Sequence, residues 1–216
     1  MSLYFVRHGE TQANAKRLYY GFLNVPLNEK GRVQVAEAGS YLKHIKFDQV
    51  IVSELLRSHE TAEAVCPNRD LWRIVPELNE MNFGDWEGLD YKMVSEKFPV
   101  TYKSWCDDWL HTAPENGERF VDFYERVCNG FKNLKLDASK NILIAGHNGP
   151  FCCLFTRFME ARPEAIWHIS FEQGAYSVVD IVDGYPVIRG MNLRHKANSI
   201  MEKRQEYDDR TVSGDY

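Results

Sequence analysis

Leu3-Tyr4-Phe5-Val6-Arg7-His8-Gly9-Glu10 begins as a short apolar run and then changes abruptly to charged and small residues. Such a run predicts a strand that is buried on both faces. Gln49-Val50-Ile51-Val52-Ser53 and Asn141-Ile142-Leu143-Ile144-Ala145 follow the same pattern, and the latter ends at Gly146-His147-Asn148-Gly149. Three strands of this kind favour a largely parallel sheet that is covered by helices.

Helical and strand patterns alternate along most of the chain, which predicts an α/β fold with a mostly parallel central sheet flanked by helices. One predicted helix has an apolar face made by Val35, Ala38, Leu42 and Ile45. A second predicted helix begins near Asn116-Gly117, and its apolar face consists of Phe120, Phe123, Val127, Phe131 and Leu134. Further predicted elements are a helix over residues 54–65, a short strand at 73–75, a helix after His147, and strands at 177–182 and 186–192 joined by a turn at Asp183-Gly184.

The domain organisation also follows from this pattern. We expect a single domain over residues 1–195 and a charged, poorly ordered tail over residues 196–216. Residues from about 85 to 117 interrupt the alternation and predict a helical insertion, with Trp105 and Trp109 four positions apart on one helix.

Composition excludes several classes of protein. The chain has 216 residues, of which 26 are basic and 31 acidic, and its net charge is −5. Without a run of lysine and arginine, a nucleic-acid or membrane partner is not expected. The five cysteines are odd in number and lack a C-x-x-C pair, so neither a disulfide framework nor a zinc site is predicted. With no signal peptide or membrane span in the pattern, we expect a cytoplasmic protein.

Three strand ends carry residues that could meet in one crevice, because open parallel sheets bind ligands outside the carboxyl ends of their strands. Arg7 and His8 follow the first strand, Arg57 comes shortly after the second, and His147 follows the third. Two guanidinium groups and a histidine can hold phosphoryl oxygens, while His8 attacks phosphorus through a ring nitrogen. Gly9 would let the backbone approach the phosphate. The spacing alone leaves ordinary roles open, such as a packed histidine or a solvated helix arginine.

Five motifs together resemble the histidine phosphatase superfamily over nearly the whole chain, and this resemblance implies a phosphoglycerate-mutase-like fold. They are VRHGETQAN (6–14), LNEKG (27–31), SELLRSHETA (53–62), LNEMNFGDWEG (78–88) and GHNG (146–149). The resemblance implies that His8 becomes phosphohistidine and that Arg7, Arg57 and His147 form the phosphate pocket. It further implies phosphate or substrate contacts from Asn14, from the backbone near Tyr20 and Gly21, and from Asn148. No cofactor and no metal are expected, because two arginines and two histidines can neutralise the phosphoryl group and no carboxylate cluster is spaced to hold magnesium.

Glu80 occupies the position of the family's proton donor to the leaving oxygen. Glu77, Asp85 and Glu87 lie in the same stretch and are its competitors, because loop carboxylates are usually only solvated. The chemistry needs one carboxyl group that donates a proton as the P–O bond breaks and later activates water. The motif selects Glu80. Trp86 either walls the pocket or belongs to the core.

Within the superfamily, the chain is most similar to the bacterial α-ribazole phosphatases of cobalamin assembly. The shared features are PELNEMNFGDWE (76–87), WCDDW (105–109) and PENGERF (114–120). They imply α-ribazole 5′-phosphate as the substrate. Two segments depart from the family, Asn148-Gly149-Pro150 and Ser58-His59. The aromatic residues that could overhang the leaving group are Tyr91, Phe98, Tyr102, Trp105 and Trp109. The alternative for Trp105 and Trp109 is that they only pin the insertion to the body of the protein.

Other functions stay open at this point. A broad-specificity phosphatase or a phosphoglycerate mutase would use the same phosphate pocket, and a regulatory protein could bind a phosphate ligand without turnover. In each case the expected partner is a small phosphomonoester. A homodimer is possible.

Overall fold

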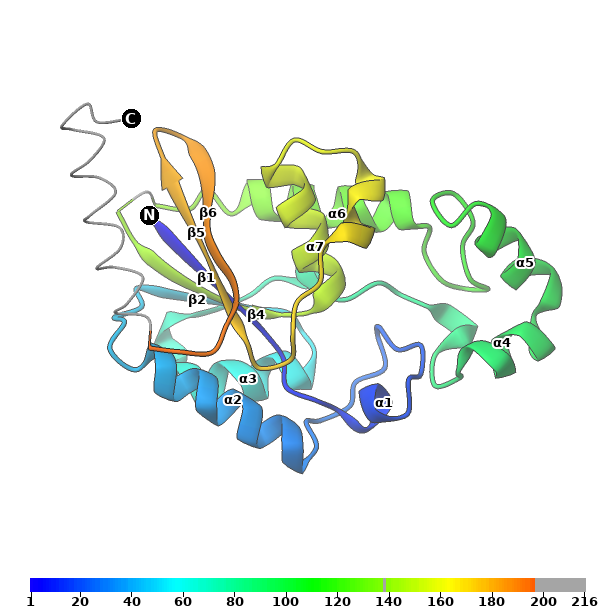
Figure 1. Cartoon of the computed structure of the whole chain (residues 1–216), viewed down its shortest axis with the longest axis horizontal. Helices are drawn as coiled ribbons and strands as arrows, with labels where there is room; N and C mark the ends of the chain where they lie inside the picture. Colours follow the sequence, from blue (N-terminus) through cyan, green and yellow to red (C-terminus); the bar gives the residue numbers. More distant parts are fainter. Residues whose placement is uncertain (138, 197–216) are drawn as a thin grey trace.

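The computed structural model describes residues 1–137 and 139–196. Within these residues six strands form one sheet in the order β3-β2-β4-β1-β5-β6 (Figure 1). The strands are β1 (Ser2–Arg7), β2 (Gln49–Val52), β3 (Trp72–Ile74), β4 (Asn141–Gly146), β5 (Tyr176–Val182) and β6 (Tyr185–Leu193). Strands β3, β2, β4 and β1 are parallel to one another, and β5 is antiparallel to both of its neighbours, β1 and β6. The predicted α/β fold with a mostly parallel sheet is confirmed.

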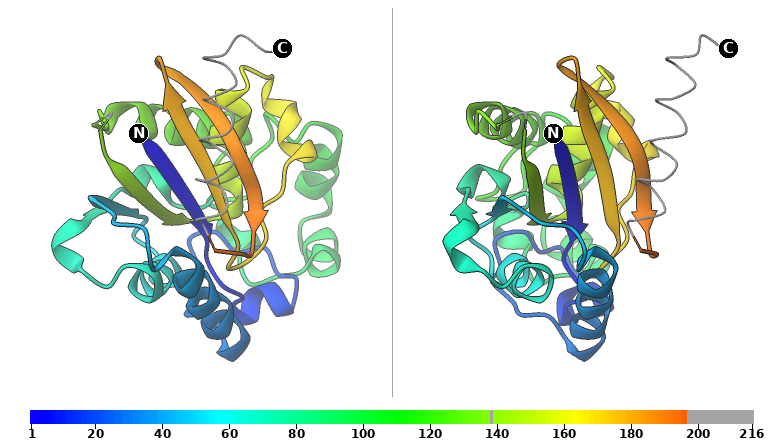
Figure 2. Two further views of the ribbon diagram at one scale, coloured as in Figure 1. Left: turned by 60° about the vertical axis from the view of Figure 1, so that its left-hand side comes forward. Right: turned by 90° about the vertical axis from the view of Figure 1, so that its left-hand side faces the viewer.

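Helices cover both faces of the sheet (Figures 1 and 2). One face carries α2 (Glu29–Leu42) and α3 (Leu56–Val65), and the other carries α6 (Phe120–Asn133) and α7 (Asn148–Phe158). Side chains of β1 alternate between the two layers. Leu3 and Phe5 join the apolar cluster with α6 and α7, whereas Tyr4 and Val6 join the cluster with α2 and α3. The strand is therefore apolar without interruption, because both of its faces are buried.

Local chemistry explains two of the element boundaries. Asn28 accepts a hydrogen bond from the Gly31 N–H at 2.8 Å, which caps the first turn of α2. The turn between β5 and β6 has φ of 51° at Asp183 and 86° at Gly184, and such positive values suit a tight hairpin. Ile45 was expected on the same helix as Val35, Ala38 and Leu42, but α2 ends at Leu42. Ile45 therefore lies beyond the helix, although it still packs against the apolar cluster that contains Ala38 and Leu42.

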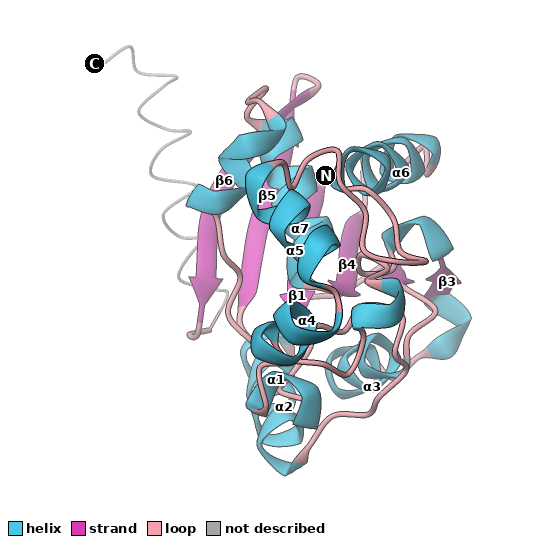
Figure 3. Ribbon diagram, turned by 90° about the vertical axis from the view of Figure 1, so that its right-hand side faces the viewer, coloured by secondary structure: helices cyan, strands magenta, loops and turns pink. Residues whose placement is uncertain are grey.

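The segment predicted as a helical insertion contains α4 (Tyr91–Lys97) and α5 (Pro99–Asp107). In Figure 3, where the right-hand side of Figure 1 faces the viewer, both helices lie in front of the sheet. Helix α5 ends at Asp107, so the expectation that Trp109 shares a helix with Trp105 is wrong. The remaining short elements are α1 (Gln12–Ala15), η1 (Arg69–Leu71), η2 (Pro76–Leu78), η3 (Gly84–Trp86) and η4 (Pro163–His168).

Two further predictions concern the ends of the chain and the membrane. The tail expected over residues 196–216 lies, apart from Lys196, outside the described residues. Across the described ranges, no helix combines the length and the apolar character needed to cross a membrane.

Candidate active site

The carboxyl ends of three adjacent strands bring the predicted site residues together. Strand β4 lies between β1 and β2 in the sheet, and Arg7 pairs with Gly146 in the parallel register. His8 and His147 therefore follow neighbouring strands, and their ring centroids are 5.3 Å apart. Arg57 comes from the first turn of α3, directly after β2. The side chains of His8, Arg57 and His147 are all buried.

The hydrogen bonding of His8 determines which of its nitrogens can attack. Nδ1 lies 2.7 Å from the Gly9 carbonyl oxygen, which can only accept, so the neutral ring carries its proton on Nδ1. The lone pair is then on Nε2. Burial and, secondarily, the positive charges of Arg57 and Arg7 hold the pKa of His8 well below its usual value. The ring is thus neutral near pH 7, as a nucleophile requires.

The two arginines face the site without carboxylate partners. Arg57 donates to the Leu23 carbonyl at 3.0 Å and the Gly21 carbonyl at 2.7 Å, and Arg7 donates to the Phe171 carbonyl. Within the part of the chain that the structure describes, neither forms an ion pair, and the Nε atom of each is buried without a hydrogen-bond partner. Burial accordingly lowers the pKa of both guanidinium groups. Enclosed cations that lack a counter-ion indicate a site for an anion.

Ser53 orients the second histidine, which sequence reasoning did not anticipate. Its hydroxyl lies 2.8 Å from His147 Nε2 and already accepts the Leu55 N–H at 3.2 Å. Among the described residues, Nε2 is the only acceptor in contact with the serine proton, and a bond in this direction leaves the proton of the neutral ring on Nδ1. This Nδ1 atom is buried and has no partner among the described residues. The Nδ1–H group is thus free to donate a hydrogen bond to a ligand. Burial, together with the positive charge of Arg57, keeps the pKa of His147 well below its usual value.

Glu80 is distinguished from the neighbouring carboxylates by its position. Its carboxylate accepts the Gly149 N–H at 3.1 Å, at the start of α7 and two residues after His147. Glu87 instead accepts the N–H groups of the loop at residues 21–23, including that of Phe22 at 2.6 Å. Asp85 accepts from the Asn116 side chain at 2.9 Å. Of these carboxylates, only Glu80 lines the cavity beside the two histidines, and its role as proton donor stays a prediction.

The predicted substrate contacts have different surroundings. Asn14 Oδ1 accepts from Thr11 and, at 2.7 Å, from the Tyr20 hydroxyl, so Asn14 has only its amide N–H groups to offer a ligand. The Tyr20 hydroxyl lies 3.5 Å from His8 Nε2, and Arg57 stacks over the Tyr20 ring at 4.7 Å. Both backbone polar groups of Gly21 are engaged in the protein. Their contacts with substrate stay predictions.

Gly9 was expected to let the backbone approach the phosphate, but the structure shows a different need for a glycine at this position. A Cβ atom at this position would lie 2.2 Å from the Gly31 carbonyl oxygen, at the start of α2. The glycine is therefore required where the loop after β1 crosses the α2 backbone.

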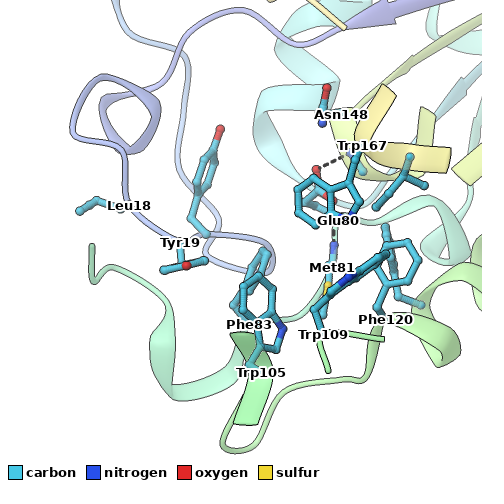
Figure 4. A pocket seen from close by; sticks show the side chains of 14 residues that line it. Leu18, Tyr19, Glu80, Met81, Phe83, Trp105, Trp109, Phe120, Asn148 and Trp167 are labelled. Carbon is cyan, nitrogen blue, oxygen red and sulfur yellow. Dashed lines mark hydrogen bonds between the residues drawn. The ribbon is translucent and has the colours of Figure 1, made fainter. Parts of the chain in front are cut away.

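An aromatic cavity of about 310 Å³ opens beside Glu80 (Figure 4). Its walls come from four parts of the chain: the loop with Leu18, Tyr19 and Tyr20; the segment with Glu80, Met81 and Phe83; the insertion and α6, with Trp105, Trp109, Phe120 and Phe123; and α7 with η4, which supply Asn148, Gly149, Ile166 and Trp167.

Three expectations about aromatic residues are settled by this cavity. Trp105 and Trp109 line it, which agrees with the first of the two roles considered for them, whereas Tyr91, Phe98 and Tyr102 do not. Trp86 is completely buried, and its indole N–H donates to Glu115 at 2.7 Å, so it belongs to the core.

Trp167 was not anticipated. It packs edge-on against Trp109 with ring centroids 5.1 Å apart and is 64% exposed. No sequence signal relates these two residues, because they come from separate segments.

Comparison with known proteins places this site in a family. The model of the histidine phosphatase superfamily, branch 1, matches residues 3–194. The chain belongs to this superfamily. The match includes all the site residues described above, and the family inferred from the five sequence motifs is confirmed.

Individual relatives of this histidine phosphatase are similar over most of their length. It is 39% identical to the adenosylcobalamin/α-ribazole phosphatase of Salmonella typhimurium over 196 residues, which cover 90% of this chain and 97% of that protein. The crystal structure of the α-ribazole phosphatase from Shigella flexneri superposes with a TM-score of 0.87 at 38% identity, covering 91% of this chain and 98% of that one. A phosphoserine phosphatase from Hydrogenobacter thermophilus is 24% identical over 195 residues.

The donor set of the site predicts activity that is independent of divalent metal. Among the described residues, no group of three His, Cys, Asp or Glu side chains is arranged to hold a metal ion. Arg7 and Arg57 can balance the charge of a phosphoryl group instead, and His147 can donate a hydrogen bond to it. We expect phosphate release to be unchanged after dialysis against excess EDTA. Loss of activity that magnesium restores would contradict this arrangement.

Proposed function

We propose that this histidine phosphatase hydrolyses α-ribazole 5′-phosphate to α-ribazole and phosphate, through a phosphohistidine formed on His8. The observation that carries the proposal is that Glu80 lies between the cluster of arginines and histidines and the aromatic cavity. On one side lie guanidinium groups without counter-ions, and on the other lies a cavity with aromatic walls. An anionic group and a flat aromatic group can thus bind on either side of one carboxyl group.

The first half-reaction transfers the phosphoryl group. Arg7, Arg57 and the Nδ1–H of His147 hold its non-bridging oxygens, and Nε2 of His8 forms a bond to phosphorus. The bond between phosphorus and the ester oxygen breaks, and Glu80, in its protonated form, gives its proton to that oxygen. The alcohol then leaves through the aromatic cavity.

The second half-reaction returns the enzyme to its starting state. Water attacks phosphorus while the Glu80 carboxylate takes a proton from it. The N–P bond breaks, inorganic phosphate leaves, and the lone pair returns to His8 Nε2. In both halves the arginines face charge that develops on the phosphoryl oxygens, and removing one such donor typically costs about 10²–10³ in rate.

The shape of the cavity supports an aromatic leaving group. Tyr19, Phe83, Trp105, Trp109 and Trp167 present ring faces and edges around a volume that can enclose a flat base. The similarity to relatives named as α-ribazole phosphatases points to a benzimidazole-like base in this position. A cytoplasmic location and a homodimer stay predictions from the sequence.

Substrate selectivity tests this proposal. We expect kcat/KM for α-ribazole 5′-phosphate to exceed the values for ribose 5-phosphate and 3-phosphoglycerate at least about a hundredfold, roughly 2.7 kcal/mol. The ratio is the right quantity, because binding of the base can lower KM or raise kcat. Phosphate release measured with the three substrates gives the answer.

Each alternative function predicts a different result in this assay. Comparable values for the three esters would indicate a broad-specificity phosphatase. Rapid phosphoryl transfer between phosphoglycerates would indicate a mutase, and binding without phosphate release would indicate a regulatory protein.

A further inference from the structure

Arg126 divides its guanidinium N–H groups between the segment that carries Glu80 and the Glu118 carboxylate. It lies in the middle of α6 and does not belong to the cavity lining. Nη1 donates to the carbonyl oxygens of Glu77 at 2.9 Å and Asn79 at 3.2 Å, and Nη2 donates to that of Glu80 at 3.3 Å. Nη2 and Nε also donate to the Glu118 carboxylate, at 2.7 and 3.2 Å. These five contacts equal the five N–H donors of an arginine.

Glu118 extends the same network to the other side of Glu80. Its carboxylate accepts the Asn82 N–H at 2.7 Å, and its own N–H donates to the Asn82 carbonyl at 3.0 Å. The backbone is thus held at Glu77, Asn79 and Glu80 by Arg126, and at Asn82 by Glu118. Fixed backbone on both sides of Glu80 limits where its carboxyl group can lie.

Helix α6 can hold this segment only because the two backbones come close together. One helical turn beyond Arg126, a Cβ atom at Gly130 would lie 2.2 Å from the Cβ of Glu77. Arg126 also stacks over the Phe123 ring, with 5.2 Å between the guanidinium carbon and the ring centroid. Phe123 in turn lines the cavity beside Glu80, so Arg126 is in contact both with the segment that carries Glu80 and with a residue of the cavity wall.

We propose that Arg126 is a positioning residue for the general acid. It holds the segment from Glu77 to Glu80 so that the Glu80 carboxylate stays on the Gly149 N–H, between the phosphate pocket and the aromatic cavity. This inference rests on the proposed function, because the chemical role of Glu80 belongs to it. The positioning itself, however, can be measured without any substrate.

The direct measurement uses the amide proton of Gly149. Gly149 is the second residue of α7, and N–H groups in the first turn of a helix have no acceptor within the helix. Its hydrogen bond to Glu80 Oε2 is therefore a reporter of where Glu80 lies. In Arg126→Ala we expect hydrogen exchange of the Gly149 amide to accelerate at least about tenfold, because local opening then exposes it.

Two internal controls accompany that measurement. The Phe151 N–H donates to the His147 carbonyl inside the same helix and is expected to keep its protection. Arg119→Ala removes an arginine at the N-terminal end of α6 that pairs with Asp122 at the surface, and it should leave Gly149 unaffected. Unchanged Gly149 protection in folded Arg126→Ala or Arg126→Lys would overturn the proposal, whatever the enzyme's activity.

The kinetic test separates positioning from a general loss of structure. A displacement of the acid by about 1 Å can cost about 10²-fold, so we expect Arg126→Ala to lower kcat/KM for α-ribazole 5′-phosphate by this amount. For 4-nitrophenyl phosphate, whose leaving group departs without a proton, the loss should stay within about threefold. Arg126→Lys keeps the charge but not the planar fork, and an intermediate loss is expected. Equal losses on both substrates would mean that Arg126 is only structural.

A double-mutant cycle distinguishes failure of this inference from failure of the proposed function. If Arg126 acts through Glu80, the variant with both Arg126→Ala and Glu80→Gln should be no slower on α-ribazole 5′-phosphate than Glu80→Gln alone. Additive losses would overturn the coupling. If Glu80→Gln shows no dependence on the leaving group while Gly149 loses protection in Arg126→Ala, the positioning is supported and the proposed acid is wrong.

Discussion

Replacing His8 with alanine is expected to reduce phosphate release at least about 10⁴-fold on every phosphomonoester, since removal of a nucleophile costs several orders of magnitude. The geometry offers no substitute. Nε2 of His8 is the ring nitrogen left without a proton by the bond from Nδ1 to Gly9, whereas His147 Nε2 is engaged by Ser53. His44→Ala, which changes an exposed histidine, is the matched control and should retain full activity.

The covalent intermediate gives this prediction a second measurement. Enzyme that is quenched during turnover with radiolabelled substrate should carry phosphate that is lost in acid and retained in alkali, and His8→Ala should carry none. Label with the opposite stability, that of a serine ester, would show that another residue is the nucleophile.

Sequence patterns predicted the sheet, and they predicted which side chains meet at its edge, for the same physical reason. A strand that is buried on both faces must be apolar throughout, so Arg7-His8 and His147 stand out at the points where β1 and β4 end. In a parallel sheet these ends lie at one edge. The convergence of both histidines with Arg57 therefore followed from local pattern and general topology together.

Other parts of the site depend on contacts between distant segments, which a local pattern does not encode. Trp105 and Trp109 were expected on one helix, but α5 ends at Asp107, and Trp109 packs instead on Phe120 and on Trp167 of η4. In the sequence, Arg126 is an ordinary charged residue on an amphipathic helix. Its role becomes visible only when α6 lies against the segment before Glu80.

The carboxylates near Glu80 show the same limit in detail. Four acidic residues lie in this short stretch, and in the sequence only the motif distinguishes Glu80 from Glu77, Asp85 and Glu87. In the structure Glu87 holds the loop whose Gly21 and Leu23 carbonyls accept from Arg57. Glu87 thus contacts Arg57 only indirectly, through the backbone of this loop, whereas Glu80 lines the aromatic cavity itself.

Glu80→Gln is expected to slow hydrolysis of α-ribazole 5′-phosphate by about 10²–10⁴-fold, the usual contribution of a general acid. An alkoxide is a poor leaving group and needs a proton as the P–O bond breaks. The amide of glutamine can still accept the Gly149 N–H but has no acidic proton to give. The substitution therefore removes the proton transfer while it keeps the contact that positions the side chain.

A substrate with a good leaving group isolates that chemical step from binding and folding. Because 4-nitrophenolate leaves without protonation, Glu80→Gln should reduce kcat/KM for 4-nitrophenyl phosphate far less than for α-ribazole 5′-phosphate. Glu77→Gln, at an exposed position of the same segment, should change neither value. Equal losses on both substrates would assign Glu80 a structural role. A substrate-dependent loss would instead mean that the carboxyl group between the arginines and the aromatic cavity transfers the proton, and that the leaving group departs on the cavity side.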